Sequence, residues 1–487
     1  MNDRPSPRAL GLRPGVNGLA RLLGVLLAAV CCVVCAQVAV AEGDFTAIAS
    51  QVDALLERSI HADTPGAAVI VARNGKIVFA KGYGLAQVET RTPINTETRF
   101  RIGSITKQFT AAAIFKLQEQ GRLDLNDPVS KYLPDWPRGR EVTLRHLLTH
   151  SSGIHNFTAK PEFETQVTQS QTLEGLVASF KHDPYDFSPG LKYRYSNSGY
   201  VLLGLIIEKV SGRSFAAYLQ KTFFDPLGMK DTGVYPSGGS LAREAFGYSY
   251  EHGAVKRSVN WEMSNVPAAG NLYSTAEDLF RWNEALFARK VISAKSLRTA
   301  FTVGVLAGDD PRHPEDAGYG FGWTIDRLNG TREISHGGEL AGFGSYLLRL
   351  PEYKLTVVVL LNCVPQLPQL QQWSLAREIA RRSLGAELPP IQKPTAFAKI
   401  TSAALDAVVG RYDLGEGAIL SVTRQDNRVF MEITGRLKFE ILPRSDRTFF
   451  VNEGEAEATF VRNRHGKVIK AILKKGGDRI DAPRLND

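Results

Sequence analysis

Three short polar motifs, each present once and in a fixed order, constrain this chain more than any other feature. They are Ser104-Ile105-Thr106-Lys107, Tyr195-Ser196-Asn197 and His336-Gly337-Gly338. A serine three residues ahead of a lysine at the start of a helix places the hydroxyl and the amine on one face, one turn apart. A serine hydroxyl needs a base within hydrogen-bond reach, and a lysine whose pKa is lowered by burial supplies one. The first motif therefore predicts a serine nucleophile beside its base.

Each motif is weak by itself, and the set is strong. Roughly one S-x-x-K pattern is expected by chance in a chain of this length. Alone, Ser104 and Lys107 would be interpreted as a helix cap and a surface charge. A tyrosine and an asparagine in a turn, or a histidine beside two glycines, have equally plain structural explanations. Because all three motifs occur in this order, a catalytic site is the better interpretation.

Length and local composition predict two domains behind an export segment. The chain has 487 residues, which exceeds the size at which one core usually stops growing. We expect a signal peptide over 1–41, a large domain over 42–387, a proline-containing linker over 388–404 and a small all-β domain over 405–487. The linker is inferred from Pro389, Pro390 and Pro394, and the β domain from short alternating stretches between turn residues.

The first 41 residues have the pattern of a cleaved export signal. Four arginines precede an apolar run from Leu22 to Val34, and Ala39-Val40-Ala41 supplies small residues at cleavage spacing. An uncleaved membrane anchor is the alternative, which Gln37 and the cleavage pattern disfavour. We expect a periplasmic or secreted protein without stable membrane insertion. Only Cys363 of the four cysteines lies beyond the signal, so no internal disulfide is expected.

Hydrophobic patterns predict a few elements around the motifs. Residues 66–72 and 77–80 flank Asn74-Gly75, which indicates a β-hairpin. Strands at both ends of the large domain are expected to pair in one sheet. The other expected elements are helices over 104–120 and 198–210 and strands over 345–350 and 355–361.

The motif set resembles that of the serine β-lactamase and penicillin-binding-protein superfamily. The likeness is to its class C β-lactamase-like, peptidase S12-like branch of esterases and D-peptidases, and it covers about residues 44–386. It implies an α+β, β-lactamase/transpeptidase-like fold, with an antiparallel sheet flanked by helices and a helical subdomain. It implies no cofactor. The supporting stretches are Tyr83-Gly84, Thr143 to Gly153, Leu272 to Leu279 and Gly318 to Trp323.

The resemblance also implies roles for the motif residues. Ser104 would be the acyl-accepting nucleophile, Lys107 its partner, and Tyr195 the general base and acid. Which of Lys107 and Tyr195 takes the first proton stays open, since their titrations would be coupled. Two backbone N–H groups, those of Ser104 and Glu339, would form the oxyanion hole. Asn197 would bind the substrate amide or hold Lys107 in place.

His336 marks a departure from the β-lactamase pattern. The chain has no Lys-Thr-Gly or Lys-Ser-Gly, and His336 stands where that lysine would be. A histidine is only partly charged near its ordinary pKa of about 6.5, so it is a poorer site for a substrate carboxylate. Gly338 would keep the strand edge open for substrate. His336 and Gly338 are thus expected to contribute to substrate binding.

These observations lead to one function and two alternatives. We expect an exported serine hydrolase that acts through a Ser104 acyl-enzyme on an amide or ester bond. Its substrate would be a peptide with D-residues or a small ester. The first alternative is a weak class C-like β-lactamase, which would turn over a cephalosporin at the same serine. The second is a penicillin-binding or ligand-binding protein with little turnover.

Other site types are disfavoured. His146, His150 and His155 invite a metal site, but no H-E-x-x-H glutamate and no nearby cysteine supports one, so a role at a helix end is preferred. The net charge of +9 falls to +6 when the four arginines and one aspartate of the leader are lost. The remaining charges are scattered, which argues against nucleic-acid binding.

The tail over 405–485 resembles the lipocalin-like barrel found after some serine peptidases of this branch. Gly410-Arg411-Tyr412, Phe449-Phe450 and Phe460 occur in the expected order. A stabilising or dimerising module and a substrate gate are equally compatible with it, so an oligomer is a possible assembly.

Overall fold

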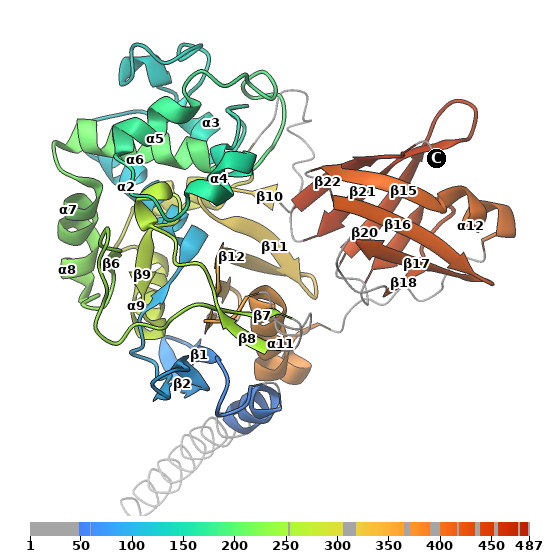
Figure 1. Cartoon of the computed structure of the whole chain (residues 1–487), viewed down its shortest axis with the longest axis horizontal. Helices are drawn as coiled ribbons and strands as arrows, with labels where there is room; N and C mark the ends of the chain where they lie inside the picture. Colours follow the sequence, from blue (N-terminus) through green and yellow to red (C-terminus); the bar gives the residue numbers. More distant parts are fainter. Residues whose placement is uncertain are drawn as a thin grey trace, which may run out of the picture.

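The structure is a computed structural model whose described residues form an α+β unit and a C-terminal β unit (Figure 1). The described residues are 48–58, 60–251, 254–304, 318–364, 371–389, 400–415, 418–433, 439–451, 456–475 and 478–485. The expected signal peptide over 1–41 lies outside them. Among the described residues, no helix has the length and apolar character that a bilayer crossing requires.

A seven-stranded antiparallel sheet forms the centre of the first unit. Strand β1 pairs with β14 on one side and with β2 on the other. The first two strands of the unit therefore lie in the same sheet as its last ones, next to β14. This confirms the expected pairing of the two ends. In order across the sheet, the strands are β10 (Gly318–Tyr319), β11 (Thr324–Leu328), β12 (Thr331–Leu340), β13 (Phe343–Leu350), β14 (Leu355–Leu361), β1 (Ala67–Arg73) and β2 (Lys76–Tyr83).

The hairpin between β1 and β2 turns where the sequence predicts. Asn74 has φ 54° and Gly75 φ 76°, the left-handed values that a two-residue hairpin turn requires. Both faces of β1 are apolar because both faces of the sheet are covered. Val69 packs with a helix over 48–57 and with α11 (Gln372–Leu384), whereas Ile70 packs with the helices of the opposite face.

The helices on that opposite face carry the first two motifs. The predicted helix from 104 begins as a 3₁₀ turn, η1 (Gly103–Ile105), and continues as α2 (Thr106–Glu119). The predicted helix over 198–210 is α6 (Asn197–Ser211), which packs against α2. The remaining helices are α3 (Leu144–Leu148), α4 (Pro161–Gln166), α5 (Leu173–Phe180), α7 (Phe215–Leu219), the π-helix η4 (Gln220–Phe224), α8 (Asp225–Leu227), α9 (Ala276–Phe287) and α10 (Ala294–Ala300).

Short sheets and turns connect these layers. Strand β5 pairs with β9 immediately before the nucleophile turn, and β9 pairs with β6 on its other side. The short strands are β3 (Leu85–Gln87), β4 (Thr92–Pro93), β5 (Phe100–Arg101), β6 (Gly233–Val234), β7 (Tyr248–Glu251), β8 (Ala254–Arg257) and β9 (Leu272–Ser274). The other 3₁₀ turns are η2 (Val129–Lys131), η3 (Phe157–Ala159), η5 (Met263–Asn265) and η7 (Gly385–Glu387).

The C-terminal unit is an eight-stranded, nearly closed antiparallel barrel. Its strands follow one another in chain order, and a bridge between Tyr412 and Arg484 links the first strand to the last. Its interior is filled by buried side chains such as Val422, Met431 and Phe460. The strands are β15 (Gly410–Gly415), β16 (Ala418–Gln425), β17 (Arg428–Ile433), β18 (Phe439–Pro443), β19 (Thr448–Val451), β20 (Ala456–Arg462), β21 (Val468–Lys475) and β22 (Asp478–Pro483).

Helix α12 (Ser402–Val408) packs on this barrel and begins inside the range expected to be linker. The Thr401 hydroxyl accepts a hydrogen bond from the Ala404 N–H and caps the helix. Leu405 and Val408 are buried in the barrel core, and the Tyr412 hydroxyl donates to the Val408 carbonyl at 2.7 Å. Residues 402–404 are thus helical, and the barrel unit starts before residue 405.

Candidate active site

Ser104 lies in the turn η1, directly ahead of helix α2. The turn is tight because Gly103 adopts φ 49°, a left-handed conformation that favours glycine. Ser104 is half-buried, whereas Lys107, in the first turn of α2, is fully buried. The Lys107 Nζ lies 3.0 Å from the Ser104 Oγ. The structure therefore brings the predicted nucleophile and base into direct contact.

The Lys107 amine is surrounded by oxygen acceptors. Its Nζ donates to the Asn197 Oδ1 at 2.8 Å and to the Ala269 carbonyl at 2.7 Å. Burial holds the pKa of Lys107 well below its ordinary value, because the charged form is poorly solvated there. A neutral amine has two N–H groups for these two oxygens and one lone pair left for the serine hydroxyl proton. This geometry suits a base that activates Ser104.

Tyr195 stands beside the same amine. It ends the loop before α6, and its ring centroid lies 4.8 Å from the Lys107 Nζ. The Tyr200 ring lies 5.4 Å from the same Nζ. Tyr195 is half-buried, so its ring borders both the buried amine and the solvent side. The first two motifs, which are separated by almost ninety residues, thus meet at one point.

Asn197 connects Lys107 to the helical subdomain. Its Nδ2 donates to the Thr158 Oγ1 at 2.9 Å, and its backbone N–H donates to the Asn156 Oδ1 at 3.0 Å. These bonds fix the side chain so that Oδ1 faces Lys107. Of the two roles expected for Asn197, the contacts in the structure are those that hold Lys107.

Strand β12 approaches the nucleophile turn closely at Gly338. A Cβ on Gly338 would lie 2.1 Å from the Ile102 carbonyl oxygen and 2.9 Å from the Ser104 nitrogen. A Cβ on Gly103 would lie 2.9 Å from the Glu339 nitrogen. Gly338 thus permits this close approach, and its expected role in keeping the strand edge open for substrate stays a prediction. As a result of the close approach, the backbone N–H groups of Ser104 and Glu339 both lie where the nucleophile turn meets strand β12.

The same half of β12 has one side without a paired strand. Strand β11 pairs with β12 only as far as Ser335, whereas β13 pairs with it on the other side up to Leu340. Among the described residues, no strand pairs with residues 336–340 on the β11 side. Backbone groups there are in position to hydrogen-bond an extended substrate.

His336 is buried and neutral. Its Nδ1 donates to the Gly337 carbonyl at 2.6 Å, and its Nε2 lies 2.8 Å from the Tyr319 hydroxyl, which donates to it. Burial, and secondarily the charge of Lys107, lowers the pKa of His336 to about 3. Both ring nitrogens are engaged within the protein. His336 thus presents no positive charge to a substrate carboxylate at neutral pH.

The buried imidazole predicts a loss of stability in mild acid. The unfolded chain takes up a proton on this residue below pH about 6.5, whereas the folded chain does so only near pH 3. Stability therefore falls as pH decreases between these values, by about 2 kcal/mol from pH 6.5 to 5 for this one group. Urea unfolding followed by tryptophan fluorescence measures the effect, since every tryptophan lies in the first unit: Trp136, Trp261, Trp282, Trp323 and Trp373.

A His336→Gln variant is the matched control for this prediction. Glutamine does not titrate, so the variant is expected to lose less stability than the parent between pH 6.5 and 5. An identical pH dependence in the two proteins would show that His336 is protonated equally in the folded and unfolded chains.

The three histidines considered for a metal site have separate partners. The His146 Nδ1 accepts from the Thr143 N–H, the His150 Nδ1 accepts from the Ser196 N–H, and the His155 Nδ1 contacts Asp186. In the described part of the chain, no three histidine, cysteine, aspartate or glutamate side chains gather as a metal site would require. His146 completes a capping box with Thr143, which matches the expected role at a helix end.

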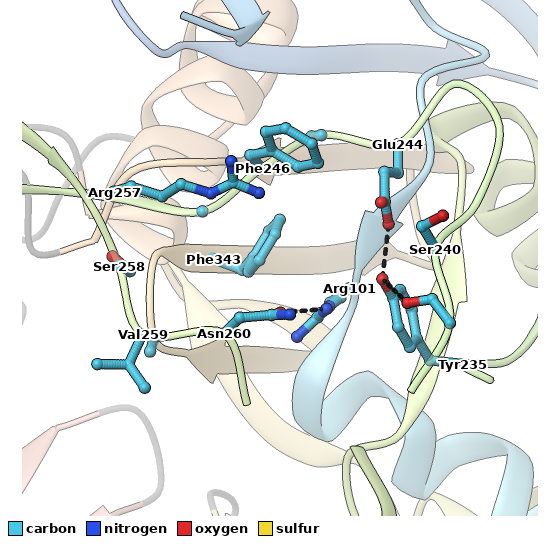
Figure 2. Close-up of a pocket in the computed structure, with 14 residues that line it drawn as sticks. Arg101, Tyr235, Ser240, Glu244, Phe246, Arg257, Ser258, Val259, Asn260 and Phe343 are labelled. Atoms are coloured by element: carbon cyan, nitrogen blue, oxygen red, sulfur yellow. Dashed lines mark hydrogen bonds between the residues drawn. The ribbon is translucent and has the colours of Figure 1, made fainter. Parts of the chain in front are cut away.

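A hollow of about 170 Å³ adjoins the β12–β13 turn (Figure 2). Arg101, three residues before the nucleophile, donates to the Asn260 Oδ1 at 2.6 Å and lies on the Tyr235 ring. The Tyr235 hydroxyl donates to Glu244 at 2.7 Å. Across the hollow, the Arg257 guanidinium lies over the Phe246 ring. No motif in the sequence marks this hollow, because its lining residues come from four separate stretches of the chain.

Sequence reasoning also missed partners of the catalytic cluster. The Ala269 carbonyl leaves no signal in a sequence, since every residue has one. Tyr319 lies in the stretch Gly318 to Trp323, which the resemblance included, but its hydrogen bond to His336 was not foreseen. Thr158 and Asn156, which orient Asn197, lie in a loop without a recognisable pattern.

Comparison with known proteins identifies the family. The family model described as Beta-lactamase matches residues 48–381, and the one described as Domain of unknown function (DUF3471) matches 397–483. Penicillin-binding protein 4* of Bacillus subtilis (strain 168) is 30% identical over 414 residues, which cover 80% of this chain and 89% of that protein.

Two solved structures share the fold. The octameric penicillin-binding protein homologue from Pyrococcus abyssi is 28% identical, covers 86% of this chain and 96% of its own, and has a TM-score of 0.60. The D-amino acid amidase from Ochrobactrum anthropi SV3 is 26% identical, covers 70% of this chain and 97% of its own, and has a TM-score of 0.59. With a family match over most of its first unit, this chain belongs to the Beta-lactamase family, the β-lactamase-fold serine hydrolases that include penicillin-binding proteins.

Proposed function

We propose that this protein is an exported serine hydrolase that cleaves amide or ester bonds through a Ser104 acyl-enzyme. The observation that carries the proposal is the buried Lys107 amine, 3.0 Å from the Ser104 Oγ and hydrogen-bonded to two further oxygens. Burial disfavours its protonation, so the amine is available as a base near neutral pH. Tyr195 completes the group on the solvent side.

The proposed reaction has two halves. In acylation, the Ser104 oxygen attacks the substrate carbonyl while its proton passes to Lys107 or Tyr195. The N–H groups of Ser104 and Glu339 hold the oxyanion of the tetrahedral intermediate. The intermediate collapses to the acyl-enzyme when the leaving amine or alcohol receives a proton from the Tyr195 hydroxyl; if Lys107 took the serine proton, Lys107 passes it on to Tyr195. In deacylation, water gives a proton to Tyr195 and attacks the acyl carbon, and the proton returns to Ser104.

His336 argues for substrates without a carboxylate on its side of the site. A neutral imidazole whose two nitrogens already have partners offers no positive charge to such a group. This supports an amide or ester substrate over a penicillin or a peptide with a free D-alanine terminus. The similarity to a D-amino acid amidase supports D-residue amides in particular. A weak β-lactamase activity remains the second candidate, because the other catalytic groups suit both reactions.

The proposal also covers the cellular location of the protein and its assembly. The arginine-led apolar segment with Ala39-Val40-Ala41 supports export to the periplasm or the exterior. An octameric homologue supports testing for an oligomer. The barrel core is filled by its own side chains, which supports a structural or assembly role for that domain over ligand storage.

Substrate pairs that differ only in a terminal charge test this function. The kcat/KM for N-acetyl-D-alanyl-D-alanine amide is expected to exceed that for the free acid by about tenfold or more, which corresponds to about 1.4 kcal/mol. A His336→Lys variant is expected to bring the kcat/KM values for the amide and the free acid closer together, since the lysine places a positive charge where the substrate carboxylate would lie. Equal or faster hydrolysis of the free acid, with penicillin as the best substrate of all, would favour the β-lactamase interpretation.

A further inference from the structure

His150 occupies an unusual position for a histidine. It follows helix α3 with φ 55°, a left-handed backbone conformation that non-glycine residues seldom adopt. Its side chain is 1% exposed. Such strain in a buried position persists only where the surrounding structure fixes it, and it is concentrated at functional sites. What His150 contacts therefore bears on the active site.

His150 holds the chain on both sides of Tyr195. Its backbone carbonyl accepts the Arg194 N–H at 2.9 Å, and its Nδ1 accepts the Ser196 N–H at 3.1 Å. These two bonds fix the peptide group between Tyr193 and Arg194 and the one between Tyr195 and Ser196.

The His150 ring also packs on the Tyr195 ring. The ring centroids are 4.1 Å apart with an angle of 35° between the planes. On other sides, the imidazole contacts the rings of Tyr319 at 4.5 Å and Tyr200 at 5.1 Å. The last of these rings also borders Lys107. His150 is therefore the common neighbour of the aromatic side chains around the buried amine.

The imidazole is neutral and carries its hydrogen on Nε2. Nδ1 accepts a hydrogen bond, and burial, which disfavours the charged imidazolium, holds the pKa of His150 well below its ordinary value. Among the described residues, the Nε2 has no hydrogen-bond partner although it is buried. An apolar side chain would avoid this unpaired donor, but it would also lose the acceptor for Ser196.

We infer that His150 is a positioning residue that fixes the Tyr195 phenol beside Lys107. The inference rests on the proposed function, in which Tyr195 transfers protons. The two backbone bonds set the position of the residue, and the stacked ring sets the direction of the phenol. His150 touches neither substrate nor Ser104 in this scheme. Its effect reaches the reaction only through Tyr195.

Two substitutions at His150 test its hydrogen bond to Ser196 and its ring contact with Tyr195 one at a time. A His150→Asn variant places Oδ1 where Nδ1 stood and tolerates the left-handed backbone, but it removes the ring. A His150→Phe variant keeps a ring and removes the acceptor. Each is expected to lower kcat by up to about 10², because a displacement of about 1 Å of a catalytic group has an effect of this size. KM is expected to stay within about threefold, since the residue does not bind substrate.

A His146→Asn variant is the matched control. His146 lies in the preceding helix α3 and caps its N-terminus together with Thr143, and its ring does not take part in the Tyr195 contacts. Its kcat is expected to remain that of the parent. All rates are divided by the fraction of enzyme that a fluorophosphonate titrates at Ser104, which removes any loss due to unfolding.

The outcomes discriminate clearly. A lower kcat per titrated site in both His150 variants, with KM and the control unchanged, supports the positioning role. An unchanged kcat per titrated site would overturn it and leave His150 as a purely structural residue. A parent enzyme that shows no Ser104-dependent acylation would instead reject the proposed function, independently of His150.

Discussion

The Ser104→Ala variant is expected to lose at least about 10⁴ of the parent kcat, because no other group at that point of the structure can form the acyl bond. The Lys107 Nζ, 3.0 Å from the Ser104 Oγ, is fully buried and engaged with Asn197 and Ala269. Folding should be retained, since Ser104 is half-buried and the turn depends on Gly103. Initial rates with an activated ester and with a D-amino acid amide measure the loss.

A Ser170→Ala variant is the control for this loss. Ser170 is exposed, and its hydroxyl forms a hydrogen bond with the hydroxyl of the exposed Ser237. Its activity should equal that of the parent. Activity of Ser104→Ala within tenfold of the parent would place the nucleophile elsewhere.

The Lys107→Met variant is expected to show the second largest effect, a fall of about 10² to 10⁴ in kcat, the range that general base catalysis contributes. Methionine matches the unbranched lysine stem and fills the buried space. It leaves the Asn197 Oδ1 and the Ala269 carbonyl without their donor, so some loss of stability should accompany the loss of rate. A Lys209→Met variant, at an exposed position of α6, should keep full activity.

The pH dependence of the parent tests the same base. Lys107 acts in its neutral form, so kcat/KM rises with pH as the amine loses its proton. Burial lowers the pKa of Lys107, so this rise should have its midpoint well below the ordinary lysine value of about 10.4. Activity that appears only above pH 10 would contradict a neutral Lys107 in the resting enzyme.

Much of the fold could be predicted because local chemistry determines it. A two-residue hairpin turn requires positive φ values, and Asn74-Gly75 adopts them readily, so the hairpin between β1 and β2 forms there. The continuous apolar run of β14 reflects a strand covered on both faces. The α+β class and the pairing of the first and last strands are confirmed in this way. The 3₁₀ turn at Ser104 was not predicted, since it depends on Gly103 and on the close approach of β12.

The sequence allowed the residues of the catalytic cluster to be predicted, but not all of their contacts or protonation states. Ser104, Lys107, Tyr195 and Asn197 were found from spacing and resemblance, and they lie together in the structure. The protonation state of His336 could not be predicted from the sequence, because its neutrality follows from burial and from the hydroxyl of Tyr319, seventeen residues earlier in the chain. His150 shows the same limit. Its pattern suggested a metal ligand or a helix end, whereas its contacts with Tyr195 appear only in three dimensions.

The most direct test of the account is the intact mass of the protein, without residues 1–41, during turnover of an activated ester. The account predicts a transient mass increase equal to the acyl group, located on Ser104, absent from Ser104→Ala, and followed by product release in excess of enzyme. Product formation at the parent rate in Ser104→Ala, or an adduct that persists in that variant, would contradict acyl-enzyme catalysis at this serine. A stable adduct without product would make this a substrate-trapping protein.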